Sequence, residues 1–356
     1  MIRVLVVDDS PSVRELLAYI LGSDPEIEIV GRAADGEDAV RMTQAYRPDV
    51  ITMDLHMPNM NGLDATRKIM QTCPTPIVIV SGSEDRGEIG ASFRAIEAGA
   101  LVVVQRPLGP GNPAHNETSN TLVKTVKSMA EVRVVRRWAK DAVRAKDRVT
   151  ERAAQPQTPR RKLVVLGAST GGPAVLREIL AELPADYALP IVIVQHMSSG
   201  FVNGFADWLS SATPISVGIA EHDAPLSGGC AFLAPDGYHA GVTADLRICL
   251  TRGQPEYGMC PSVSHLFRSV GKTLSPSTAA VLLTGMGKDG ALELRRLKES
   301  GALTIVQDRA TSAVYGMPGE AIKLDAARLI LEPAEIGKTL RAFGEDISSH
   351  FPFHAI

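Results

Sequence analysis

The chain has 356 residues, of which 45% are hydrophobic and 22% charged, and its net charge at pH 7 is −3. This length predicts about two domains, and the near-neutral charge gives no electrostatic reason to expect nucleic-acid binding. No apolar run approaches the ~20 residues of a transmembrane helix, and the N-terminal stretch "MIRVLVVDDS" lacks a signal-peptide pattern, so we expect no insertion into a membrane.

The first part of the chain, residues 1–125, alternates short apolar runs with segments of helical periodicity. Near-continuous apolar runs are typical of parallel strands that are buried on both faces. The five runs are "IRVLVVDD", "IEIVGRA", "PDVITMD", "TPIVIVSG" and "ALVVVQRP". Apolar residues recur at helical spacing in "PSVRELLAYILGS", "GEDAVRMTQAY" and "GLDATRKIMQ". The pattern predicts a doubly wound α/β domain with a five-stranded parallel sheet.

The character of the sequence changes after about residue 106. A Thr/Ser/Asn cluster opens a helical segment in which Leu122, Val126 and Met129 share one face, and this face can pack on the first domain. Beyond Trp138 the apolar stripe gives way to Lys and Arg, and "AAQPQTPRR" has the composition of a linker. We therefore expect a linker helix and a flexible linker over residues 126–160, with the basic side chains in solvent.

Residues 161–350 again alternate strand and helix patterns. Strands are predicted at "KLVVLGAS", "LPIVIVQHM", "AAVLLTGMG" and "ALTIVQD", and helices from about Pro173, around "FVNGFADWLS" and at "SVSHLFRSVGK". The stretch "GGCAFLAPDGYHAGVTADLRICLT" has a hairpin pattern. The sequence therefore predicts a second, larger α/β domain with a mainly parallel sheet and an antiparallel hairpin insert.

Polar side chains follow several of the predicted strands in the first domain. Asp8 and Asp9 end the first strand, Asp54 follows the third, Ser81 the fourth and Arg106 the fifth. The carboxyl ends of parallel strands share one edge, which is where open α/β sheets bind ligands. Three carboxylates gathered there repel one another unless a cation intervenes, and hard oxygen ligands favour Mg²⁺. Helix capping would explain one such acid but not five polar residues at successive strand ends.

These residues resemble the response-regulator receiver domain, over roughly residues 1–125. The resemblance implies that Asp54 is the phosphorylated aspartate, consistent with the ability of a carboxylate to accept a phosphoryl group. It also implies that Asp9, Asp54 and the main-chain carbonyl of His56 hold Mg²⁺, with Asp8 just behind them, and that Ser81 contacts the phosphoryl group. The resemblance to a receiver also implies a histidine kinase as phosphodonor.

Two positions depart from the receiver pattern. The family usually has Lys where this chain has Arg106, and an aromatic residue where it has Val103. Both positions belong to the switching machinery of the family, so we expect phosphorylation to proceed but its activating effect to be smaller.

The first predicted strand of the second domain ends in the Gly-rich stretch "GASTGG". It matches the G-x-S-x-G pattern of nucleophilic serines, with Ser169 between a strand and a helix N-terminus. A Ser that merely caps a helix in a Gly-rich turn would look the same. His196 ends a neighbouring strand and Asp289 follows a third, so three strand ends supply a nucleophile, a base and an orienting acid. An α/β-hydrolase order would instead require His350 or His354 from the tail.

The motifs "GASTGG", "QHM" and "LTGMGKDG" resemble those of the chemotaxis-type protein-glutamate methylesterases, the CheB family. The stretches "FLAPDGYH", "PSVSHLFRSV" and "SAVYGMPGEAI" extend this resemblance over nearly the whole chain. It implies Ser169 as nucleophile, His196 as base and Asp289 as its orienter, with Thr170 beside the nucleophile and the Met286 N–H in the oxyanion hole. One departure lies at "MCPSVS", where Cys260 and Ser264 replace the Arg and the Asp of the common H-R-P-S-V-D.

The resemblance implies hydrolysis of methyl esters on glutamate side chains of methyl-accepting chemoreceptors, and deamidation of receptor glutamines, in chemotaxis adaptation. The esterase would need no cofactor, and Mg²⁺ would belong to the receiver. The cysteines lack metal-ligand or disulfide spacing, which favours reduced thiols and a cytoplasmic location: Cys73, Cys230, Cys249 and Cys260.

Two other classes of protein fit the sequence less well. A phospho-regulated, non-enzymatic adaptor could bind a nucleotide on "GASTGG", but this loop lacks the G-x-G-x-x-G spacing, and the next strand ends in Gln195-His196 rather than in an acid. A DNA-binding response regulator would need a recognition helix or a basic domain after the receiver, and we find neither pattern.

Overall fold

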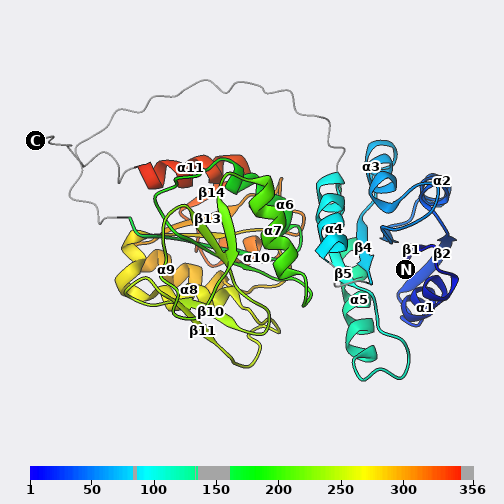
Figure 1. Cartoon of the computed structure of the whole chain (residues 1–356), viewed down its shortest axis with the longest axis horizontal. Helices are drawn as coiled ribbons and strands as arrows, with labels where there is room; N and C mark the ends of the chain where they lie inside the picture. Colours follow the sequence, from blue (N-terminus) through cyan, green and yellow to red (C-terminus); the bar gives the residue numbers. More distant parts are fainter. Residues whose placement is uncertain (83–85, 133, 135–160, 346–356) are drawn as a thin grey trace, which may run out of the picture.

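Two parallel β-sheets, one in each half of the chain, organise the structure (Figure 1). It is a computed structural model that describes residues 1–82, 86–132, 134 and 161–345. Most of the predicted linker and both tail histidines, His350 and His354, lie outside these residues. No helix in the described ranges has the length and apolar character needed to cross a membrane.

The N-terminal sheet has five strands in the order β2-β1-β3-β4-β5, all paired in parallel. This confirms the prediction of a doubly wound five-stranded domain, and the inner strands are buried along their length because nearly every residue in them is apolar. The elements of this domain are β1 (Ile2–Val7), α1 (Pro11–Gly22), β2 (Ile27–Ala33), α2 (Gly36–Tyr46), β3 (Val50–Met53), α3 (Gly62–Thr72), β4 (Ile77–Ser81), α4 (Arg86–Ala98), β5 (Val102–Gln105) and α5 (His115–Ala130).

Helix α4 was not among the helices that the sequence predicted. Its first turns contain Gly87 and Gly90, which lower helix propensity, so tertiary packing rather than local preference accounts for it. Helix α5 agrees with the prediction, because Leu122, Val126 and Met129 are all buried in the core of the first domain.

The C-terminal sheet has seven strands in the order β14-β13-β12-β6-β7-β9-β8, and all of its pairs are parallel. Strands β10 and β11 form a separate antiparallel hairpin. The elements are β6 (Leu163–Ala168), α6 (Gly172–Ala181), β7 (Ile191–Gln195), α7 (Val202–Ala212), β8 (Ser216–Ile219), β9 (Cys230–Leu233), β10 (His239–Val242), β11 (Ile248–Thr251), α8 (Val263–Leu274), η1 (Ser275–Ser277), β12 (Thr278–Leu282), α9 (Ala291–Glu299), β13 (Leu303–Gln307), α10 (Met317–Lys323), β14 (Leu329–Leu331) and α11 (Pro333–Glu345).

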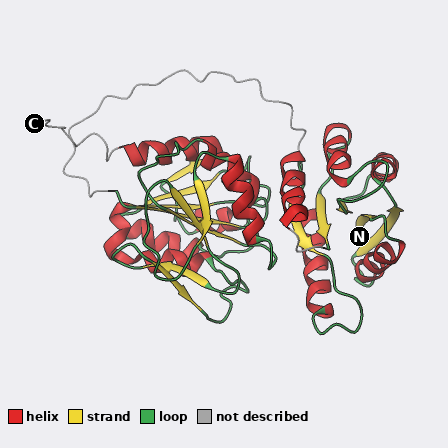
Figure 2. Cartoon of the chain, viewed as in Figure 1, coloured by secondary structure: helices red, strands yellow, loops and turns green. Residues whose placement is uncertain are grey.

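The hairpin is shorter than the sequence pattern suggested. The "CAFL" segment is β9, which joins the parallel sheet between β7 and β8 instead of pairing with β10. Alternating burial looks the same in both settings, but here Ala231 and Leu233 are buried within the parallel sheet. The mainly parallel sheet and the hairpin insert are otherwise as predicted. Helices cover both faces of the large sheet (Figure 2): α6, α7 and α11 pack into one core, and α8, α9 and α10 into the other.

The two domains meet where α4 packs against α7 and α6 (Figure 1). Phe93 of α4 is 2% exposed, and its ring centroid lies 5.1 Å from that of Phe205 and 5.3 Å from that of Trp208, both on α7. At the edge of this contact the Arg177 guanidinium lies 3.4 Å from the Glu97 carboxylate. The interface is therefore an aromatic cluster with a polar margin.

Candidate active site

Three adjacent strands in the middle of the large sheet, β12, β6 and β7, carry the predicted esterase residues just beyond their carboxyl ends. Ser169 follows β6, His196 follows β7, and Asp289 follows β12 after a short loop. Backbone hydrogen bonds fix this edge: the Ser169 N–H donates to Thr284 O at 3.0 Å, and the His196 N–H donates to Ala168 O at 2.9 Å. Parallel pairing thus brings together residues separated by more than a hundred positions in the chain.

His196 and Asp289 are in direct polar contact. Nε2 of His196 lies 3.0 Å from Oδ2 of Asp289, so this nitrogen carries the proton that the carboxylate accepts. Nδ1 then bears the lone pair, and it is buried without a hydrogen-bond partner among the described residues. In the familiar serine protease arrangement the two ring nitrogens have the opposite roles. Ser169 Oγ is not hydrogen-bonded to Nδ1 here, which is common before substrate is present.

The Asp289 carboxylate is 2% exposed and is surrounded by donors. Its Oδ1 accepts from the Ser262 hydroxyl at 2.9 Å and from the Ser264 N–H at 2.8 Å, and its Oδ2 accepts from the Val263 N–H at 2.8 Å as well as from His196. Burial raises the pKa of Asp289, but the hydrogen bonds from His196 and Ser264 outweigh it and hold the pKa at about 2. The group is therefore a fixed anion at neutral pH.

The loop after β12 lies directly against the nucleophile. A Cβ added to Gly285 would lie 2.5 Å from the Ser169 Cβ, so only glycine permits this approach. The following residue, Met286, has a 59% exposed side chain whose sulfur lies 3.1 Å from the Ser128 hydroxyl of α5. Thr170 lines the same cavity as Ser169, and its carbonyl accepts from the Thr284 hydroxyl at 2.9 Å. Thr170 therefore lies in the cavity beside Ser169, and the oxyanion role of the Met286 N–H stays a prediction.

Gln195 was not singled out from the sequence, yet it joins two of the strand ends. Its side-chain amide donates to Ser169 O and to His196 O, both at 2.8 Å, and the residue is 7% exposed. The only available signal was an amide side chain next to His196 at the end of an apolar strand. Its contacts fix the backbones of the nucleophile and the base relative to one another.

A cavity of about 470 Å³ opens onto Ser169, Thr170 and His196. One wall belongs to the esterase domain and includes Met259 and Cys260, the rim that departs from the CheB pattern. The opposite wall belongs to the first domain, and α5 contributes Glu117, Thr118, Thr121 and Thr125 to it. The first domain therefore borders the esterase site directly.

The acidic edge of the first domain gathers the residues that the sequence predicted there. Asp8 is fully buried and Asp54 is 6% exposed, while Asp9 is exposed at the rim. Arg106 Nη2 lies 3.3 Å from Asp54 Oδ1 and 3.7 Å from Asp8 Oδ2. The His56 N–H donates to Asp54 Oδ2 at 3.2 Å. Ser81 ends β4 and is buried, and Val103 of β5 is buried in the core that spans the domain contact.

The groups around the buried carboxylates at this edge do not fully stabilise them as anions. Burial raises the pKa of Asp8 to about 6, and the nearby charge of Asp54 adds to the effect. Burial also raises the pKa of Asp54, although Arg106 opposes it. Oδ2 of Asp8 is buried and accepts no hydrogen bond from any residue that the structure describes. A set of carboxylate oxygens, one of them buried and without a hydrogen bond, suits a hard divalent cation such as Mg²⁺.

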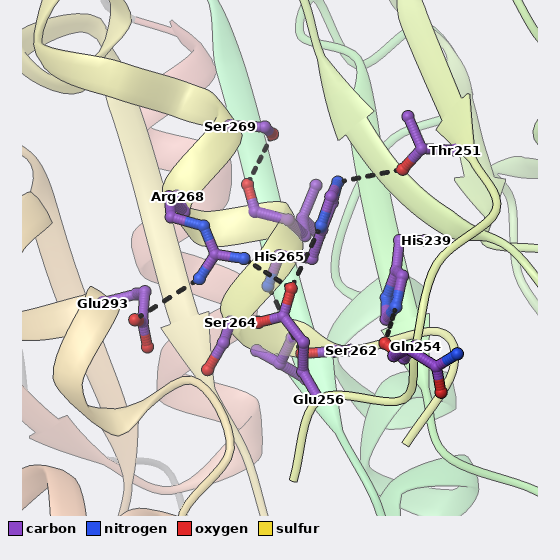
Figure 3. Close-up of polar contacts among 12 residues, drawn as sticks. His239, Thr251, Gln254, Glu256, Ser262, Ser264, His265, Arg268, Ser269 and Glu293 are labelled. Carbon is purple, nitrogen blue, oxygen red and sulfur yellow. Dashed lines mark hydrogen bonds and ion pairs between the residues drawn. The ribbon is translucent and has the colours of Figure 1, made fainter. Parts of the chain in front are cut away.

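One other cluster in the described part of the chain has donors of the kind that metals use: His239, Glu256 and His265 (Figure 3). The His239 and His265 rings are stacked, with centroids 4.8 Å apart and planes at 18°, so their in-plane lone pairs do not converge on one point. Glu256 is already paired with Arg268 at 2.5 Å. We interpret this cluster as a structural support for the start of α8.

The fold and the two sites define a class of protein: a response regulator whose effector domain is a serine hydrolase. The family model for the response regulator receiver domain matches residues 4–112, and that for the CheB methylesterase matches residues 164–340. The chain belongs to the CheB methylesterase family.

Curated relatives extend this similarity over almost the full length. The chain is 48% identical to protein-glutamate methylesterase/protein-glutamine glutaminase 1 of Syntrophus aciditrophicus, over 96% of this chain and 97% of that protein. It is 50% identical to the protein-glutamate methylesterase/protein-glutamine glutaminase of Nitrosospira multiformis, over 96% of each. The crystal structure of the Thermotoga maritima CheB methylesterase catalytic domain is 33% identical, with a TM-score of 0.50, and covers 52% of this chain and 99% of that one.

Proposed function

We propose that this protein hydrolyses methyl esters on glutamate side chains of chemoreceptors, deamidates specific receptor glutamines to glutamate, and is regulated by phosphorylation. The observation that carries the proposal is the buried His196–Asp289 pair beside Ser169, at the ends of three adjacent strands. Curated relatives at about half identity have names that state both activities. A nucleotide-binding adaptor is not supported, because relatives that match almost the whole chain have names that state hydrolytic activities.

In the first half of the reaction, Ser169 Oγ attacks the ester carbonyl while His196 Nδ1 takes its proton. Asp289 holds the proton on Nε2 and stabilises the imidazolium that forms. Backbone N–H groups near Ser169, with that of Met286 as the first candidate, stabilise the oxyanion. The imidazolium then protonates the leaving oxygen, methanol departs, and the glutamyl group stays on Ser169 as an ester.

In the second half, water attacks this ester while His196 takes a proton from it, and the Ser169 oxygen leaves with that proton. The product is the free glutamate carboxylate. A glutamine side chain follows the same path, except that ammonia is the first leaving group. Both reactions need only the residues of this site.

We expect Asp54 to accept a phosphoryl group at the acidic edge of the first domain, from a chemotaxis-type histidine kinase. Asp9, Asp54 and the carbonyl of His56 would hold Mg²⁺ there, with Asp8 adjoining them, and the unused buried oxygen of Asp8 fits such an ion. The chemistry that Mg²⁺ supplies is neutralisation of charge on the transferred group. Ser81 would contact the phosphoryl group, and Arg106 would pair with it as it now pairs with Asp54.

Regulation would operate through access to Ser169. Helix α5 forms one wall of the cavity, and α4 is packed on α7, so displacement of the first domain would widen the access of a receptor helix or loop to the serine. Phosphorylation would weaken this packing. Because Arg106 is bulkier than Lys and Val103 cannot rotate as an aromatic ring does, we expect a smaller activation than in relatives with Lys and an aromatic residue. All four cysteines are free thiols, which favours a location in the reducing cytoplasm.

The test is release of methanol from methylated receptor membranes by the full-length protein, with and without acetyl phosphate as phosphodonor. We expect slow release alone and faster release with the donor. Ser169→Ala protein that remains folded but releases no methanol assigns the activity to this site. Undiminished release by Ser169→Ala would contradict the proposal.

A further inference from the structure

The first turn of α8 is wrapped around the carboxylate that orients the catalytic histidine. Four donors converge on the two oxygens of Asp289, and three of them come from consecutive residues of this turn: Ser262, Val263 and Ser264. Ser262 is the N-cap of α8, so the carboxylate also lies at the positive end of the helix. The fourth donor is His196 itself. The turn thus supplies three of the four hydrogen bonds that hold the anion.

Ser264 makes a second contact that fixes the chain next to Asp289. Its hydroxyl oxygen accepts from the Gly290 N–H at 2.9 Å, and the residue is fully buried. Gly290 has a φ of +83°, and a Cβ at this position would lie 2.5 Å from Val263 Cγ1. The backbone after Asp289 therefore lies against α8 closely enough that neither partner can shift alone.

The same turn is anchored on its outer side by the His239–Glu256–His265 cluster (Figure 3). The His265 N–H donates to Ser262 Oγ at 3.3 Å, and its ring lies 3.3 Å from Glu256 Oε1 and stacks on His239. Arg268, one turn further along α8, binds Glu256 at 2.5 Å. A continuous set of contacts therefore runs from the outer cluster through Ser262 to Asp289 and His196.

We propose that Ser262 and Ser264 are positioning residues of the esterase, which fix the Asp289 carboxylate and thereby set how readily His196 takes the proton of Ser169. Neither reaches the reacting atoms. Removing a donor leaves more uncompensated negative charge on Asp289, which stabilises the imidazolium and makes His196 a base that is protonated at higher pH. The inference rests on the esterase function proposed above.

The substitution Ser264→Asp tests the effect of an added negative charge separately from the loss of a hydrogen-bond donor. Asp is the residue that the CheB pattern commonly has here, and at the second residue of a helix it is well tolerated. In this chain it would place a second carboxylate beside Asp289 while retaining an acceptor for the Gly290 N–H. Other charged or titratable groups around the pair do not change in this variant: His265 and Arg268 of α8, Glu256 in the loop before it, Glu293 of α9, Lys288, Cys260 and Glu117 of α5.

The experiment compares wild-type full-length protein with Ser262→Ala, Ser262→Thr, Ser264→Asp and a matched control, Ser269→Ala. Ser269 lies on the same helix, donates to Leu266 O and accepts from the Val242 N–H, and it is not among the residues that hydrogen-bond to Asp289. Two readouts are needed: the pH profile of methanol release, and the NMR titration of the His196 ring, which requires no substrate.

We expect Ser262→Ala to lower kcat by about 10- to 100-fold with little change in KM. It should also move the acidic limb of the pH profile, where methanol release falls as the pH is lowered, to higher pH. Ser262→Thr should restore both, and Ser264→Asp should move the limb and the His196 titration up by about one pH unit with the fold intact. A His196 titration that is the same in Ser262→Ala, Ser264→Asp and Ser269→Ala would overturn the inference. Wild-type protein that releases no methanol would instead refute the proposed function, and the NMR titration would still decide the positioning role.

Discussion

Replacing Phe93 with Ala should open the enzyme without phosphorylation. Burial of a Phe side chain stabilises a contact by about 1.5–3 kcal/mol, and each aromatic pair adds about 0.5–1.5 kcal/mol. Phe93 is 2% exposed and packs on two rings, Phe205 and Trp208, so the closed arrangement should lose about 2.5–6 kcal/mol. At 1.4 kcal/mol per factor of ten, this shifts the equilibrium between closed and open forms by about 60- to 20,000-fold.

The assay is methanol release by unphosphorylated full-length protein, beside a fragment that lacks residues 1–150. The fragment sets the ceiling, and Phe93→Ala should rise by at least about tenfold, or to that ceiling if it is lower. Tyr19→Ala removes an exposed aromatic ring on α1, away from the contact, and should have no effect. Arg177→Ala breaks only a half-exposed ion pair, which contributes at most about 1 kcal/mol, so its effect should be below about fivefold.

Two results would refute the reasoning. Wild-type protein as active as the fragment would mean that the first domain does not restrict access. Phe93→Ala with wild-type activity, still far below the fragment, would mean that the aromatic cluster does not hold the domains together. A denaturation midpoint for each variant separates these outcomes from unfolding of the first domain.

Ser169→Ala and His196→Ala should each abolish most turnover, and the double variant should cost little more than either, because the residues act as one unit; additive losses would contradict this. Asp289→Asn should leave a remnant of on the order of 10⁻³ to 10⁻⁴ of wild-type kcat, measured by the same methanol assay. Because the pKa of Asp289 is held at about 2, the stability that this contributes is present above its ordinary value of 3.8 and is lost as pH falls toward 2. A denaturation midpoint followed against pH should therefore show this loss only below pH 3.8, and a loss between pH 7 and 5 that Asp289→Asn abolishes would contradict the assignment. Asp54→Asn should keep basal release but lose all response to acetyl phosphate, as should wild-type protein after removal of Mg²⁺ with EDTA. Truncation before His350 should leave esterase activity intact, whereas its loss in a folded truncated protein would return the base role to the tail.

The apolar pattern of the sequence was sufficient to predict the strands of this fold that are buried on both faces. Buried parallel strands are almost wholly apolar, so β1, β3, β4, β6, β7 and β12 could be recognised, and with them the strand ends that carry Asp54, Ser169 and His196. Helix α4 could not, because Gly87 and Gly90 weaken its local preference and packing against its neighbours supplies what they remove.

The hydrogen-bond donors around Asp289 could not be predicted from the sequence, for a different reason. Two of its donors are backbone N–H groups, of Val263 and Ser264, and every residue but proline has one, so no residue type marks them. The exchange of roles between Nδ1 and Nε2 of His196 likewise depends on the direction from which the carboxylate approaches. Sequence spacing indicated which residues meet, and only the packing of α8 against the loop after β12 defines how.

The order of the two domains along the chain has a consequence for synthesis. The first domain leaves the ribosome before the strands that carry Ser169, His196 and Asp289, and domains generally fold in the order in which they emerge. Helices α4 and α5 are therefore in place when α6 and α7 form, and they can cover the cavity as it is built. Asp289 follows Ser169 by 120 positions, so the nucleophile has no oriented base until most of the chain has been made. A newly made molecule would thus be closed as soon as its second domain has folded, without an interval of unregulated hydrolysis.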